Sequence, residues 1–75
     1  MEEHNFGWAL AKLKAGEKVS RDGWHGKGQY LSLQRPDAGS ANTLPYIFIV
    51  VDGHRVPWVA SQSDLLMDDW DVVAL

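Results

Sequence analysis

The chain has 75 residues, no cysteine and a formal net charge of −3. A chain of this length holds one hydrophobic core, and without cysteine it has no disulfides to stabilise it, so we expect a single domain over residues 1–75 that forms a homo-oligomer. The negative charge argues against binding of duplex nucleic acid. Because no apolar run approaches the ~20 residues needed to cross a bilayer, and the first residues are acidic, we expect a cytoplasmic protein with no membrane partner.

An amphipathic helix is predicted near the start of the chain. Asn5 can cap it, Lys12 and Lys14 suit its last turn, and Gly16 can end it. The apolar residues follow the spacing of one helix face, and they are Phe6, Ala9, Leu10 and Leu13.

The remainder of the chain predicts strands. Val19–Arg21 reads as a short strand that turns at Asp22 and Gly23, and residues 29–33 read as a second strand. Residues 34–45 are rich in turn formers, so we expect an exposed loop there and assign it no chemistry. Tyr46–Val51 and residues 54–58 flank the Asp-Gly pair at 52–53, which is a strong hairpin signal.

The C-terminal part predicts a short helical turn through residues 64–67, capped by Ser61 or Ser63, and a last strand over residues 70–73. The expected fold is therefore α+β: one N-terminal helix packed with a small, mainly antiparallel sheet, and a short helical turn before the last strand. No linker or repeat indicates a second domain.

Catalysis is not indicated. The serines and histidines lie in no recognisable nucleophile motif, so we predict no catalytic residue and read the serines as helix caps. The acidic residues Asp68, Asp69 and Asp71 lack the ligand pattern and glycine of a calcium loop, and we expect them to form a solvated face. We accordingly expect no metal site and no cofactor.

The most unusual run is Gly-Trp-His-Gly-Lys-Gly at residues 23–28. Glycines let the backbone approach a ligand and turn N–H groups toward an anion, to which Lys27 would add charge. Trp24 offers a flat surface on which a purine could stack. The competing interpretation is an ordinary glycine-rich turn with Trp24 in the core, and spacing alone does not decide between them.

A second unusual run covers residues 56–64, where a strand ends in proline and Trp58 and is followed by hydroxyl, amide and carboxylate groups. Ser61 and Gln62 suit the polar edges and ribose hydroxyls of a nucleotide. The competing interpretation is strand-end packing followed by a helix cap, and it is slightly favoured for Ser63 and Asp64.

Large rings are numerous for one small core, and some are expected at an interface or in a pocket, although all could lie in the core. They are Phe6, Trp8, Trp24, Tyr30, Tyr46, Phe48, Trp58 and Trp70. We assign Trp8 and Trp70 to the core or an interface.

These motifs together resemble a family of short phage proteins described as Thoeris anti-defence sponges. The resemblance spans nearly the whole chain and is carried mainly by three segments: residues 6–16, residues 19–28 and residues 56–66, with further matches at Tyr46, Ile47, Asp69 and Trp70. The chain departs from the family at His25, where Asn is usual, and at Gln29, where Met is frequent.

The resemblance implies a homo-oligomer, typically a tetramer, that sequesters cyclic ADP-ribose isomers such as glycocyclic ADP-ribose without catalysis and so deprives a bacterial immune effector of its signal. Some members hold cyclic oligonucleotides at a separate site. On this hypothesis Trp24, with Trp58 or Phe6, stacks on the base. The other candidate ligand-binding residues are Lys27, Arg21, His25, Ser61 and Gln62, with Lys27 and backbone N–H groups holding the diphosphate and Arg21 a weaker candidate. The rival functions are an enzyme that degrades the same signal and a protein–protein interaction module.

Overall fold

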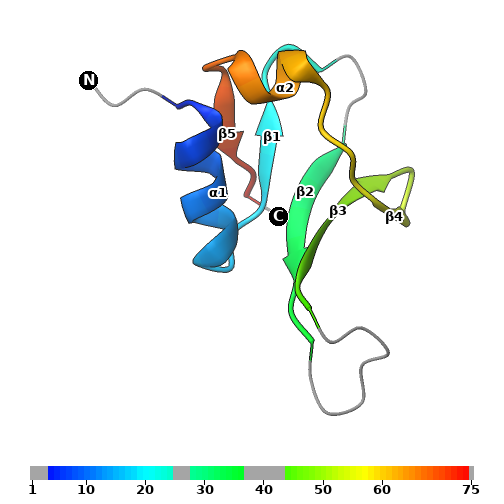
Figure 1. The fold of residues 1–75 in the computed structure, drawn as a ribbon. Helices are drawn as coiled ribbons and strands as arrows, with labels where there is room; N and C mark the ends of the chain where they lie inside the picture. Colours follow the sequence, from blue (N-terminus) through cyan, green and yellow to red (C-terminus); the bar gives the residue numbers. More distant parts are fainter. Residues whose placement is uncertain (1–3, 25–27, 37–43, 75) are drawn as a thin grey trace.

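A computed structural model describes residues 4–24, 28–36 and 44–74, and it confirms the α+β fold (Figure 1). The elements, in chain order, are α1 (Phe6–Lys14), β1 (Val19–Arg21), β2 (Tyr30–Gln34), β3 (Tyr46–Val51), β4 (His54–Pro57), α2 (Gln62–Leu66) and β5 (Trp70–Val72).

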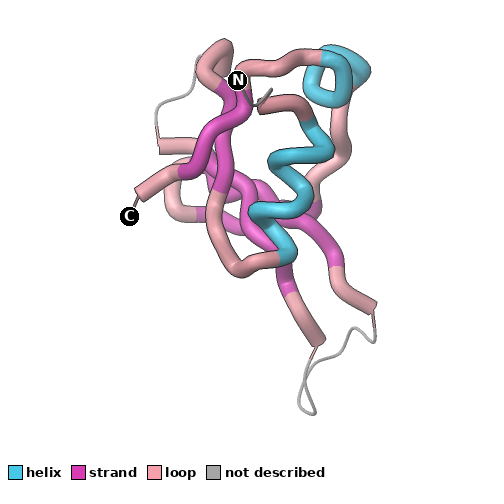
Figure 2. Tube along the Cα trace, turned by 90° about the vertical axis from the view of Figure 1, so that its left-hand side faces the viewer, coloured by secondary structure: helices cyan, strands magenta, loops and turns pink. Residues whose placement is uncertain are grey.

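The strands form one sheet in the order β4-β3-β2-β1-β5, and every neighbouring pair is antiparallel. Val19 lies opposite both Leu31 of β2 and Val72 of β5, so β1 joins the hairpin strands to the last strand. Because side chains alternate along a strand, Val19, Leu31 and Val72 share one face of the sheet. Helix α1 lies across that face, in contact with β5, β2 and β1 (Figure 2).

The predicted helix is confirmed, together with its boundaries. The side chain of Asn5 accepts a hydrogen bond from the backbone N–H of Trp8 at 2.9 Å, which satisfies a donor that a helix N-terminus leaves free. Lys12 and Lys14 occupy the last turn, and Gly16 follows with φ of +93°, a conformation that favours glycine. No helix in the described ranges is long and apolar enough to span a membrane.

The Asp-Gly hairpin is also confirmed. Asp52 and Gly53 have φ of +50° and +78°, and positive φ at both central residues is typical of the two-residue turn whose twist matches that of the flanking strands.

Some strand boundaries differ from the prediction by one residue. Strand β2 begins at Tyr30 and not at residue 29, because its pairing with β3 runs from Tyr30 opposite Val50 to Gln34 opposite Tyr46. The last strand ends at Val72, one residue earlier than predicted.

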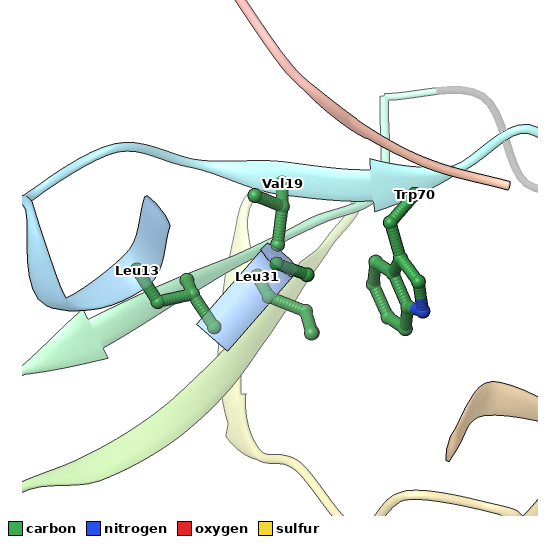
Figure 3. Close-up of a cluster of buried hydrophobic side chains, with 5 residues drawn as sticks. Leu13, Val19, Leu31 and Trp70 are labelled. Carbon is green, nitrogen blue, oxygen red and sulfur yellow. The ribbon is translucent and has the colours of Figure 1, made fainter. Parts of the chain in front are cut away.

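The core lies between α1 and the sheet and includes Leu13, Val19, Leu31 and Trp70, each at most 1% exposed (Figure 3). Ala9 completes this cluster. Of the two residues assigned to core or interface, Trp70 therefore belongs to the core, whereas Trp8 is half-buried. The alternative that every large ring lies in the core is wrong, because Tyr46 is exposed.

Candidate ligand-binding site

The three aromatic residues predicted to stack on a ligand converge on one buried ring. Trp70 of β5 has its ring centroid 5.5 Å from that of Phe6, 5.4 Å from that of Trp24 and 6.1 Å from that of Trp58. The interplanar angles of 62°, 79° and 88° are those of favourable edge-to-face contacts. Phe6, Trp24 and Trp58 pack against the core cluster but are only half-buried, so each residue keeps part of its surface accessible.

Trp24 is fixed in place by more than this packing. Its indole Nε1–H donates to Oδ1 of Asp64 at 3.1 Å, and its backbone N–H donates to the carbonyl of Arg21 at 3.2 Å. The indole N–H is therefore already used within the protein, and a ligand would meet the ring as a stacking surface. The two interpretations of Trp24 are not exclusive, because its ring packs on Trp70 while the residue as a whole is only half-buried.

Arg21 joins two carboxylates from distant parts of the chain. Its Nη1 lies 2.8 Å from Oδ1 of Asp64, and its Nε lies 2.8 Å from Oδ1 of Asp69. The arginine side chain is only 11% exposed, and the hydrogen bonds that it donates to Asp69 and Asp64 raise the pKa of Arg21 above its ordinary value. A ligand phosphate would have to compete with both carboxylates for this guanidinium. Arg21 is therefore a poorer candidate for anion binding than an unpaired cation would be.

The expectation that all three clustered acidic residues form a solvated face is wrong for Asp69. Its carboxylate is half-buried, pairs with Arg21 and accepts a hydrogen bond from the backbone N–H of Gly23 at 2.9 Å. Asp68 and Asp71 are exposed, as predicted. Within the described ranges no three acidic or histidine side chains are grouped so that they could hold a metal ion.

Both paired carboxylates titrate below their ordinary range. Burial of Asp64 opposes its ionisation, but hydrogen bonds from Arg21, Ser61 and Trp24 outweigh this cost and lower the pKa. For Asp69, the hydrogen bond from Arg21 is the main cause of the lowered pKa, burial opposes it, and the N–H of Gly23 adds to it. Both side chains are therefore anionic at neutral pH.

Ser61, and not Ser63, caps α2. Its Oγ accepts from the backbone N–H of Asp64, while Oδ2 of Asp64 accepts from the backbone N–H of Ser61, each at 3.1 Å. This reciprocal pair is a capping box, so Asp64 stabilises the helix and also holds Arg21 and Trp24. Gln62 is exposed in the first turn of α2. His25 and Lys27 lie outside the described residues.

An apolar groove of about 880 Å³ opens beside Phe6 and Trp58, between α1, α2 and the ends of β2 and β3. Tyr46 lines it, as do two cationic residues, Lys14 and Arg35. The guanidinium of Arg35 donates a hydrogen bond to the carbonyl of Lys14 and so holds the end of β2 to the end of α1. A groove with aromatic walls and cations suits a flat base attached to anionic groups.

Sequence reasoning missed Lys14, Arg35 and Tyr46 as lining residues. Lys14 suits a helix terminus on sequence grounds, and residues 34–45 carried no assigned chemistry. The groove arises because the end of α1 lies beside the end of β2, and no local sequence signal reports that arrangement.

Comparison with known proteins shows the family to which this chain belongs. Residues 4–73 match the model of the Thoeris anti-defense 2-like domain. The chain belongs to the Thoeris anti-defense 2-like family. Among the relatives of this family member is the protein Thoeris anti-defense 2 of Bacillus phage SP01, which is 38% identical over an alignment of 84 residues that covers 93% of this chain and 94% of the phage protein. The resemblance inferred from the motifs is thereby confirmed, and every residue of the aromatic cluster and of the Arg21 network falls inside the matched range.

Proposed function

We propose that this member of the Thoeris anti-defense 2-like family counters Thoeris defence by sequestering a cyclic ADP-ribose isomer, such as glycocyclic ADP-ribose, and leaving it chemically intact. The observation that carries the proposal is the convergence of Phe6, Trp24 and Trp58 on Trp70, in which each of the three residues stays half-buried and so partly accessible. The family membership and the phage relative support the anti-Thoeris role.

In this proposal the adenine base stacks on the accessible part of one of these rings, and stacking on an aromatic side chain contributes about 1–3 kcal/mol. Capture of a signal present at sub-micromolar concentration requires a total binding free energy of more than about 8 kcal/mol, so stacking alone is insufficient. Lys27 and nearby backbone N–H groups, other than those of Gly23 and Trp24, would hold the diphosphate. Gln62, and the O–H donor that the Ser61 cap leaves unused, would bind ribose hydroxyls.

The proposal includes assembly into a homotetramer with ligand held between protomers. Exposed apolar side chains around α2 support assembly, because Val59 is 88% exposed, Leu66 is 80% exposed and Leu65 borders the groove. Burial of these side chains by a second copy would add apolar contact area that a 75-residue core lacks.

A capture-and-release experiment tests the function. Each cyclic ADP-ribose isomer is mixed with excess protein, the free pool is separated and measured, and the protein is then denatured by heat. We expect one isomer or more to disappear from the free pool and to reappear with unchanged mass and retention time. An opened or hydrolysed product would show an enzyme, and no depletion of any isomer would leave an interaction module. Cyclic oligonucleotides belong in the same panel, because the family resemblance implies a separate site for them in some members.

A matched pair of lysine variants tests the anion contact. Lys27→Ala should weaken capture, while Lys18→Ala removes the same charge at a half-buried residue that lines neither the groove nor the aromatic cluster. We expect the melting temperature of the ligand-free Lys27 variant to stay within a few degrees of wild type, because lysine side chains rarely contribute to a hydrophobic core. Equal capture by both variants would refute the role of Lys27.

A further inference from the structure

The glycine-rich run at residues 23–28 is anchored at its start by two carboxylates. Oδ2 of Asp69 accepts the backbone N–H of Gly23 at 2.9 Å, and Oδ1 of Asp64 accepts the indole N–H of Trp24 at 3.1 Å. Arg21 binds both carboxylates at 2.8 Å and so fixes them relative to each other. The backbone and the side chain at the start of the run are thus tied to α2 and to the segment before β5.

We propose that Asp64 and Asp69 are positioning residues for ligand binding: together with Arg21 they hold the backbone of Gly23 and the ring of Trp24 in their binding geometry before the ligand arrives. This inference rests on the proposed function. Neither carboxylate is proposed to touch the ligand.

The close packing around Gly23 leaves no room for a side chain. A Cβ atom at this position would lie 2.9 Å from Oδ2 of Asp69 and 3.3 Å from Nη2 of Arg21. Such a distance is too short for a carbon–oxygen contact, so a side chain at residue 23 would displace the carboxylate. Glycine is therefore required here for the close approach of Asp69. At Gly28, by contrast, it is required by a φ of +78°.

The net charge of Arg21, Asp64 and Asp69 makes it possible to distinguish positioning from long-range electrostatics by experiment. The group of Arg21, Asp64 and Asp69 carries one positive and two negative charges, so its net charge opposes an anionic ligand. If electrostatics at a distance were its only influence, Asp69→Asn would remove a negative charge and tighten the binding of a diphosphate. If the carboxylate positions Gly23 and Trp24, the same substitution weakens binding, because apparent affinity falls with the fraction of protein in the competent conformation.

The test measures affinity for a captured cyclic ADP-ribose isomer by titration calorimetry in Asp69→Asn and Gly23→Ala. The matched control is Asp68→Asn, which makes the same charge change at the adjacent, exposed residue. We expect the dissociation constant to rise about tenfold or more in both test variants and less than about twofold in the control. All titrations are run well below the melting temperature of each variant, so that global unfolding does not contribute.

Binding by Asp69→Asn that is as tight as, or tighter than, binding by Asp68→Asn would overturn the inference. If Asp69→Asn does not fold, Gly23→Ala decides the question by the same criterion, since it keeps both carboxylates and displaces one of them. If wild type binds no isomer, the proposed function fails on its own, and the anchor is then judged by hydrogen exchange. The indole N–H of Trp24 should exchange about tenfold faster in the test variants than in the control. Equal exchange rates would show that the anchor does not order this segment.

Discussion

The substitution Trp70→Phe should destabilise the protein strongly. It removes the hydrogen bond from the indole Nε1–H to the carbonyl of Asp64, which is 3.0 Å long and buried, and an unsatisfied buried acceptor costs about 1–3 kcal/mol. It also leaves unfilled volume between Phe6, Trp24 and Trp58, and we assign that loss about 1–2 kcal/mol, because truncation of a core aromatic all the way to alanine costs about 3–5 kcal/mol.

The total of roughly 2–5 kcal/mol is large for this chain, since at about 0.05–0.15 kcal/mol per residue a domain of 75 residues has a free energy of unfolding of roughly 4–11 kcal/mol. Urea denaturation followed by circular dichroism, at one fixed protein concentration, measures the change. In a domain of this size, where about 1 kcal/mol shifts the melting temperature by about 4–8 °C, that temperature should fall by roughly 8–40 °C.

Trp8→Phe provides the matched control. Trp8 is half-buried and stacks on His4 with centroids 3.9 Å apart, so the same chemical change should cost less than about 1 kcal/mol there. Equal destabilisation by the two variants, or a loss below about 1 kcal/mol for Trp70→Phe, would refute the view that the ring of Trp70 organises the aromatic cluster.

Three further outcomes are expected. Because Asp64 and Asp69 have lowered pKa values in the folded state, the stability from their pairs with Arg21 is present above the ordinary value of 3.8 and is lost as the pH falls through the lower folded values. Urea denaturation at a series of acidic pH values should therefore show a shallower decline in Asp69→Asn than in wild type, and parallel curves would count against the pairs. Ser61→Ala should lower the free energy of unfolding by about 0.5–2 kcal/mol, because it removes the N-cap of α2. Ser63→Ala makes the same change within α2 at a serine that is not the cap, so it should not lower this free energy by a comparable amount. Light scattering at micromolar protein should show a mass above the 8.4 kDa monomer, and a monomer would exclude a site shared between protomers.

Local features of this fold could be predicted because their signals lie within a few residues of each other. Asn5, the apolar spacing and Gly16 locate α1, and the Asp-Gly pair at 52–53 locates the hairpin turn. The start of β2 was missed by one residue, because it is set by pairing with β3 and not by the residues of β2 themselves.

The site could be predicted only in part. Phe6, Trp24 and Trp58 are predicted from the sequence as candidate stacking residues, but their common contact with Trp70 depends on the sheet order, which the sequence pattern does not provide. Asp69 is 48 positions from Arg21 along the chain, and an acidic residue among other acidic residues resembles a solvated face. Only the pairing of β1 with β5, which sets Arg21 opposite Trp70, brings the two charges together.

The place of β5 in the sheet has a consequence for synthesis on the ribosome. The ring that completes the core is contributed by β5, and His4 bonds to the backbone of Trp70 across 66 positions of the chain. A nascent chain that has released α1 and the β3–β4 hairpin therefore still lacks the side chain against which Phe6 and Trp58 pack. Contacts this distant in sequence form late, so the half-made protein presents these rings to its surroundings until residue 70 has emerged. Folding of the domain is thus expected to follow translation of its last strand, in one cooperative step.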